Sequence, residues 1–327
     1  MTVLVTGATG FIGGALARRL VETGQQTRVL VRNPQKLDNL QGAVEVIVGN
    51  LTDPAAVDRA TEGVETVYAV AAAFREPGLS DERHREVNVE AVGQVMAAAR
   101  RHGVRRVVHC STVGIHGPVK GPPLNEDAPI VPIGIYEETK AEGEALAMRH
   151  GRDGGPPVVV LRPTQVYGPG DTRLLKLFKL ADKQRVLLIG PGIAGYHLVY
   201  IDDLVDAFLL AAGAGEGAVG EAFIIGGPER PTLNDIIRTL GPILGHAEQT
   251  IVRLPVKPVE LFAAGCETVC RPFGITPPIY RRRLDFFTMN KAYDIGKARR
   301  ILGFEPKVPM AEGLRRTVEW YRQGGML

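Results

Sequence analysis

Short apolar segments alternate with amphipathic helical segments through the first half of this 327-residue chain, and this alternation constrains the fold more than any other feature. We expect strands at residues 1–5, 27–31, 44–48, 64–70, 106–110 and 157–161. Helices are expected at 12–23, after the Thr52-Asp53-Pro54 start signal, at 82–102 and at 136–150. Strands that alternate with helices at this spacing predict an α/β fold, a doubly wound parallel sheet with its ligand crevice at the carboxyl ends of the strands.

The alternation becomes less regular after about residue 168, where prolines and glycines cluster at 190–192, 226–228 and 277–278. We predict a large domain over 1–168 and a smaller substrate-binding part over 169–327, and we allow for a return of the chain to the large domain around 195–226. The apolar segment 254–269 either walls an apolar pocket in the smaller part or forms a helix packed on the core.

Three glycines, Gly7, Gly10 and Gly13, lie between the first predicted strand and the first predicted helix. Glycines in this context permit a tight turn and let backbone N–H groups approach a pyrophosphate at the helix N-terminus, so the turn predicts a Rossmann-type dinucleotide site. The residue that closes the second strand selects between cofactors, and here it is Arg32, with Lys36 nearby. An arginine accepts the 2′-phosphate, which favours NADP(H) and leaves NAD(H) as the alternative.

Tyr136 and Lys140 are four residues apart in a predicted helix, a spacing that puts both on one face. A free tyrosine has a pKa of about 10 and is a poor base near neutrality. A lysine ammonium beside it, together with an oxidised nicotinamide, stabilises the phenolate and brings it into the catalytic range. Ser111 and Thr112 follow the fifth strand, where a hydroxyl can hydrogen-bond the substrate oxygen.

Nearly end to end, these motifs resemble the extended short-chain dehydrogenases/reductases of the NAD-dependent epimerase/dehydratase superfamily. The glycine turn, Tyr136 with Lys140, and segments 161–171, 199–207 and 293–304 carry the resemblance, which also implies that the carboxylates at the start of 199–207 cap a helix. It implies Thr112, Tyr136 and Lys140 as catalytic residues, with Ser111 as the fallback hydroxyl, and Asn88 as a support of the site. The cofactor contacts it implies are Gly7, Thr9, Gly10, Phe11, Ile12, Arg32, Asn50 (where relatives usually have Asp), Leu51, Ala71, Lys140 and Pro163.

Two departures favour one branch of this superfamily over another. Nucleotide-sugar epimerases and dehydratases usually have an arginine where this chain has Tyr196, and an asparagine where it has Gln165. Segments 277–280 and 283–286 instead resemble the dihydroflavonol-reductase and 3β-hydroxysteroid-dehydrogenase branch. We therefore expect an enzyme that transfers a hydride between NADP(H) and a carbonyl or secondary alcohol of a fairly apolar small molecule.

Two other functions stay open. The arginines at 281–283 could replace the missing arginine of a nucleotide-sugar epimerase or dehydratase that uses bound NAD. Some members of the superfamily are non-catalytic dinucleotide-binding regulators or assembly factors, but those usually lack the Tyr/Lys pair that this chain has.

Composition limits the remaining possibilities. The net charge of +3 does not suggest a nucleic-acid surface, and three cysteines (Cys110, Cys266 and Cys270) without ligand-like neighbours suggest a reducing cytoplasm and no metal site. The chain starts directly with a strand, and its apolar stretches are far shorter than the ~20 residues of a membrane span, so we expect a soluble cytoplasmic protein. By analogy with relatives, we expect a homodimer that associates through the helices at 82–102 and 136–150.

Overall fold

The computed structural model describes residues 1–74, 78–118, 121, 123–270, 287 and 290–327. The sequence elements at 277–280, 281–283 and 283–286 lie outside these ranges.

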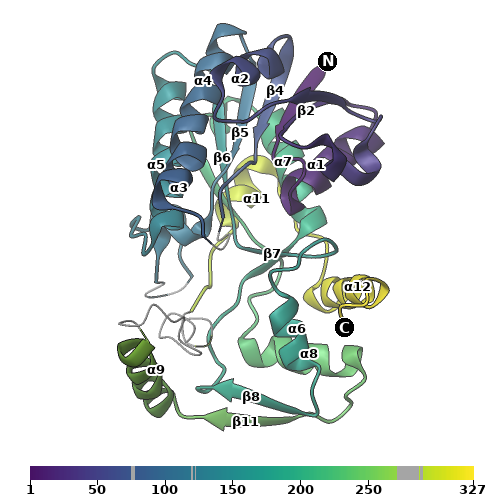
Figure 1. Cartoon of the computed structure of the whole chain (residues 1–327), viewed down its shortest axis with the longest axis vertical. Coiled ribbons are helices and arrows are strands. Elements are labelled where there is room, and N and C mark those ends of the chain that lie inside the picture. The colour runs from purple at the N-terminus through teal and green to yellow at the C-terminus, as the bar shows by residue number, and fades with distance from the viewer. Residues whose placement is uncertain (75–77, 119–120, 122, 271–286, 288–289) are drawn as a thin grey trace.

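The described residues form a parallel sheet of seven strands in the order β10-β6-β5-β4-β1-β2-β3 (Figure 1). This confirms the predicted doubly wound α/β fold and adds one strand, β10, to the six that were expected. The order reverses between β1 and β4, and open α/β sheets bind ligands beyond the carboxyl ends of the strands at such a reversal. The strands are β1 Thr2–Thr6, β2 Gln26–Val31, β3 Glu45–Val48, β4 Val64–Ala69, β5 Arg106–Cys110, β6 Val158–Pro163 and β10 Ala222–Ile225.

Helices cover both faces of this sheet (Figure 1). The sheet separates the apolar core into two clusters. Val5 packs with one cluster, on the side of α1 and α7, whereas its neighbour Leu4 packs with the other, on the side of α2 and α4. Successive side chains of a strand point to opposite faces, which is why β1 has the apolar run Val3-Leu4-Val5 and β6 the run Val158-Val159-Val160-Leu161. The first face has α1 Phe11–Glu22, α7 Ile201–Gly213 and α11 Gly296–Leu302, and the second has α2 Pro54–Thr61, α3 Asp81–Arg85, α4 Ala91–Arg101 and α5 Ile135–Arg152. Short 3-10 turns occupy Pro34–Leu40, Val113–His116 and Glu216–Ala218.

Two expectations about helices need correction. The predicted helix at 82–102 contains a π turn over Glu86–Glu90 between α3 and α4. The expected carboxylate caps of α7 are wrong, because neither Asp202 nor Asp203 caps this helix, whose N-cap residue is Tyr200. The Asp203 carboxylate instead accepts the backbone N–H groups of Lys307 (2.8 Å) and Val308 (3.2 Å), so it connects α7 to the C-terminal segment.

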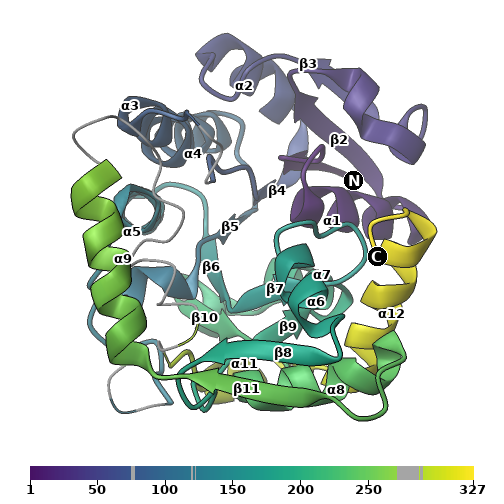
Figure 2. The same ribbon diagram turned by 60° about the horizontal axis from the view of Figure 1, so that its bottom comes forward.

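The smaller part lies below the sheet in Figure 1, and Figure 2 shows its two strands, β8 and β11, side by side. The strands β7 and β9 form a second two-stranded parallel sheet, separate from the large one. Within α9, Ala263 alone is buried, and Leu261, Phe262 and Val269 are exposed, so segment 254–269 is not a helix packed on the core. The elements of the smaller part are β7 Gln165–Tyr167, α6 Leu175–Ala181, β8 Arg185–Ile189, β9 Leu198–Tyr200, α8 Leu233–Leu244, β11 Thr250–Leu254, α9 Val256–Cys270 and α12 Met310–Gln323.

Among the described residues, we find no helix with both the length and the apolar character that crossing a bilayer requires.

Candidate active site

The tight glycine turn requires residues without side chains at Gly7 and Gly13. Gly7 has a φ of +76°, and a Cβ there would lie 2.8 Å from the Cα of Ala71. A Cβ at Gly13 would lie 2.3 Å from the Gly7 carbonyl oxygen, a distance that real Cβ atoms do not adopt. The helix α1 starts at Phe11, and its N-cap residue Gly10 supplies no capping side chain. The first N–H groups of α1 are therefore available to an anion at the positive end of the helix dipole.

Thr6, the last residue of β1, joins the two strands at which the sheet order reverses. Its Oγ1 accepts hydrogen bonds from the backbone N–H groups of Val70 (3.0 Å) and Ala71 (3.2 Å), just beyond β4. These bonds hold Ala71 beside Gly7, where the two backbones approach each other closely. The sequence placed Thr6 in front of the turn but did not reveal this role.

Arg32 and Asn50 lie close together at the other end of the predicted cofactor site. Arg32 is exposed directly after β2, and the N–H of Gly49 donates to the carbonyl of Val31 (3.0 Å). This bond brings the loop with Asn50 and Leu51 beside the end of β2. Asn50 Oδ1 also accepts the N–H of Thr52 (3.3 Å) in the turn that leads into α2. The open glycine turn, the uncapped α1 and this basic loop together fit a dinucleotide cofactor.

Lys140 lies in α5, four residues after Tyr136, and its side chain is buried. Its side chain is 2% exposed, and its Nζ donates a hydrogen bond to the Cys110 carbonyl oxygen at the end of β5 (2.5 Å). Burial lowers the pKa of Lys140, and the Cys110 and Glu144 side chains oppose this shift. The lysine thus connects α5 to the strand that precedes the candidate hydroxyl residues.

Thr112 lies against the start of α5. It is the N-cap residue of the short helix Val113–His116, and its Oγ1 accepts the N–H of Gly114 (3.1 Å). A Cβ on Gly114 would lie 3.3 Å from both Thr112 Oγ1 and Glu137 Cγ, so this glycine lets the loop approach the residue next to Tyr136. Ser111 is 3% exposed, and its Oγ has no hydrogen-bond partner among the described residues.

Asn88, in the π turn, fixes the segment that follows β4 to α5. Its side chain is 1% exposed, accepts the N–H of Ala73 (2.8 Å), and donates to the Ala73 carbonyl (3.1 Å) and to Thr139 Oγ1 (3.0 Å). π turns occur frequently at functional sites. Asn88 therefore holds the backbone after β4 against α5, and its support of a catalytic site stays a prediction from the family resemblance.

Sequence reasoning missed a group of side chains that is connected to Tyr136 through Phe74. The Phe74 ring packs edge-on against the Tyr136 ring, with 4.6 Å between centroids. The guanidinium carbon of Arg173 lies 5.2 Å from the centroid of the Phe11 ring and 5.8 Å from that of the Phe74 ring. The only available signal was the position of Arg173, two residues after the matched segment 161–171.

A buried ion pair lies behind the site, between β6 and α5. Arg162 donates to both carboxylate oxygens of Glu144, and the two side chains are 7% and 5% exposed. Arg162 also donates to His116 Nε2 (3.2 Å) and to the Glu126 carbonyl (3.1 Å). Burial lowers the pKa of His116, and a neutral imidazole can accept this bond while its Nδ1–H donates to the Pro129 carbonyl (3.1 Å).

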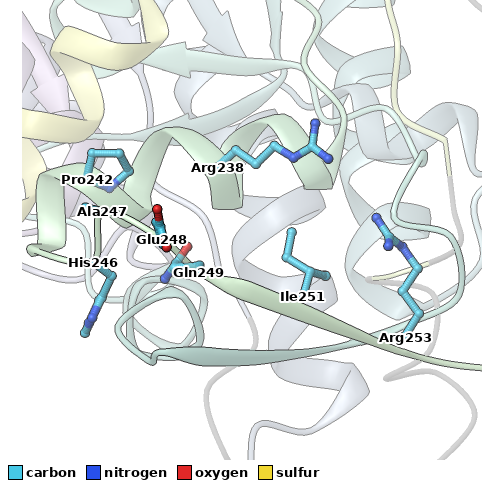
Figure 3. A pocket seen from close by; sticks show the side chains of 8 residues that line it. All are labelled: Arg238, Pro242, His246, Ala247, Glu248, Gln249, Ile251 and Arg253. Atoms are coloured by element: carbon cyan, nitrogen blue, oxygen red, sulfur yellow. The ribbon is translucent and has the colours of Figure 1, made fainter.

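A cavity of about 470 Å³ lies away from these residues, on α8 and β11 of the smaller part (Figure 3). His246 in its wall pairs with Asp182 (2.9 Å), and Arg238 is exposed on α8. Its lining brings together none of the residues predicted for the site. The lining residues are Arg238, Pro242, His246, Ala247, Glu248, Gln249, Ile251 and Arg253.

Comparisons with known proteins identify a family model, relatives and solved structures that are similar to this chain. The model of the NAD dependent epimerase/dehydratase family matches residues 3–226. A 2-alkyl-3-oxoalkanoate reductase of Stenotrophomonas maltophilia is 33% identical over 97% of this chain and 98% of its own length. The decarboxylating sterol-4-alpha-carboxylate 3-dehydrogenase of Schizosaccharomyces pombe is 28% identical over 98% of this chain and 97% of its own. The crystal structure of a UDP-glucose 4-epimerase from Thermotoga maritima is similar with a TM-score of 0.78 and 27% identity, over 99% of both chains.

Proposed function

This chain belongs to the NAD dependent epimerase/dehydratase family, and we propose that it works there as a ketoreductase. Its relatives make it an NAD(P)-dependent oxidoreductase of the extended short-chain type. The observation that carries the proposal is Tyr196, which takes the place of an arginine in nucleotide-sugar enzymes and is 1% exposed. A buried phenol provides no positive charge for the pyrophosphate of a sugar nucleotide.

The proposed chemistry uses Tyr136 as the proton donor to the carbonyl oxygen. A nicotinamide cofactor, when bound at the glycine turn, supplies the hydride. Lys140 stabilises the developing phenolate electrostatically, and its bond to the Cys110 carbonyl fixes the position of the ammonium. The Thr112 hydroxyl positions the substrate oxygen at the end of β5.

We further propose an apolar substrate and a preference for NADP(H). The names of these two relatives describe a 3-oxoalkanoate and a sterol carboxylate, whose skeletons are largely hydrocarbon. The preference for NADP(H) rests on the exposed Arg32 after β2, since a guanidinium pairs well with a 2′-phosphate.

The test is net oxidation of NADPH or NADH with medium-chain ketones and 3-oxo acids, beside interconversion of UDP-sugars. Tyr136→Phe should lower turnover by about 10²–10⁴-fold, the usual contribution of a positioned acid, with cofactor affinity unchanged in a fluorescence titration. Tyr293→Phe removes a hydroxyl from another buried ring and is the matched control. Tightly retained NAD with interconversion of UDP-sugars and no net redox change would show that the chain is an epimerase.

A further inference from the structure

The Arg173 guanidinium is held by hydrogen bonds from two of its three nitrogens. Its Nε donates to Asp171 Oδ1 (2.6 Å), and its Nη2 donates to the Val166 carbonyl (3.2 Å). Asp171 is 1% exposed, and its carboxylate also accepts the N–H groups of Arg173 and Leu174. These contacts fix the plane of the guanidinium. The third nitrogen, Nη1, has no hydrogen-bond acceptor among the described residues, and the side chain is 36% exposed.

The surroundings of this guanidinium connect it to the reacting end of the site. It lies over the rings of Phe11, at the start of α1, and Phe74, which packs against Tyr136. Aromatic faces attract a cation and exclude water from its sides. An anion that meets the guanidinium there is less screened than in open solvent, so the attraction is stronger.

We propose that Arg173 binds a carboxylate of the substrate, and that the substrates are 3-oxo acids with an apolar chain. Such an acid offers a carboxylate to Arg173 and a carbonyl to Tyr136, two residues that contact the same Phe74 ring. Nη1 and the second N–H of Nη2 form the pair of donors that a carboxylate accepts side by side. This inference rests on the proposed ketoreductase function.

The cofactor pyrophosphate is the competing anion for Arg173. The uncapped N–H groups at the start of α1 already serve it. The contact between Phe74 and Tyr136 instead connects Arg173 to the carbonyl that is reduced. We assign Arg173 to the substrate on the basis of this contact, and NADPH binding to Arg173→Gln distinguishes the two anions.

The experiment compares a charged and a neutral form of one substrate, 3-oxooctanoate and its methyl ester. Wild-type enzyme should have the higher kcat/KM for the acid. In Arg173→Gln, kcat/KM for the acid should fall by about 10–100-fold, mostly through KM, as expected for the loss of a hydrogen bond between charged groups. The value for the ester should change less than about 2-fold. Arg173→Lys keeps the charge without the planar pair of donors and should lie between.

Controls separate this role from a structural one. Arg238 is an exposed arginine on α8, and Arg238→Gln should leave kcat/KM unchanged for both the acid and the ester. Equal losses for acid and ester in Arg173→Gln would mean that the arginine only holds its loop. Weaker NADPH binding in a fluorescence titration would mean that it binds the cofactor. A wild-type preference for the ester would overturn the proposal without any variant, whereas reduction of neither compound would overturn the ketoreductase function as well.

Discussion

Replacing Glu144 with leucine should destabilise the fold strongly, because it leaves the Arg162 guanidinium buried without a counter-charge. Glu144 accepts hydrogen bonds from two nitrogens of Arg162, and both side chains are almost fully buried. Arg162 would keep its bonds to His116 and to the Glu126 carbonyl, but both of these acceptors are neutral. Removing one partner of a buried ion pair typically costs about 3–5 kcal/mol.

The assay is urea unfolding followed by far-ultraviolet circular dichroism. With a denaturant dependence of about 2–3 kcal/mol per M, the midpoint should fall by about 1–2.5 M. The double variant with Glu144→Leu and Arg162→Met should recover most of this loss, since a buried ion pair replaced by apolar residues of similar volume is often neutral.

The same helix offers a matched control. Glu142 pairs with Arg85 at 2.6 Å, but the two side chains are 45% and 48% exposed. Exposed pairs contribute about 0–1 kcal/mol, so Glu142→Leu should leave the midpoint nearly unchanged. The reasoning about burial is refuted if Glu144→Leu and Glu142→Leu shift the midpoint equally.

Three further predictions follow from the site and the core. Arg32→Glu should lower the ratio of NADPH to NADH affinity by at least about 10-fold in calorimetric titrations, because a carboxylate repels the 2′-phosphate; an unchanged ratio would contradict the role of Arg32. Gly13→Ala places a Cβ 2.3 Å from the Gly7 oxygen and should weaken binding of both dinucleotides, whereas unaltered affinity would contradict the close approach. Burial, and then the Lys140 ammonium, lowers the pKa of His109 well below its ordinary value of about 6.5, so the folded state binds fewer protons than the unfolded state. The free energy of unfolding should therefore fall as the pH drops below about 6.5, and His109→Leu should reduce that slope by up to about 1.4 kcal/mol per pH unit; an identical slope would contradict the argument.

The predicted strands and the spacing of Tyr136 and Lys140 came from local patterns. A strand covered on both faces tends to contain runs of apolar residues, and β5, with Val107 and Val108 at its centre, matches its prediction at both ends. Two residues four apart on a helix share a face whatever surrounds them, so the relation of Tyr136 to Lys140 could be predicted without the fold. The bond between Lys140 and the Cys110 carbonyl could not, because it depends on how α5 packs beside β5.

Features that depend on distant partners were missed for the same reason. The carboxylate of Asp203 has the sequence context of a helix cap, but its partners are backbone groups about a hundred positions later, at Lys307 and Val308. Arg173 looks like an ordinary loop residue until Phe11 and Phe74 are seen beside it. The apolar residues of α9 suggested burial, but composition alone does not say whether another element covers a helix.

The reversal of strand order at β1 has a consequence for how such a protein can diversify. The proposed cofactor-selecting residue Arg32 and the Asn50 loop lie on the β2–β3 side of β1, within one continuous stretch of chain. Tyr136, Lys140 and Thr112 lie on the side of β5 and β6. A single exchange of residues 26–53 between relatives would therefore transfer the proposed adenosine end as one continuous segment, and would leave the proposed acid–base groups on their own strands and helix. The proposed choice of cofactor could accordingly be inherited, or engineered, without changing the proposed acid–base groups.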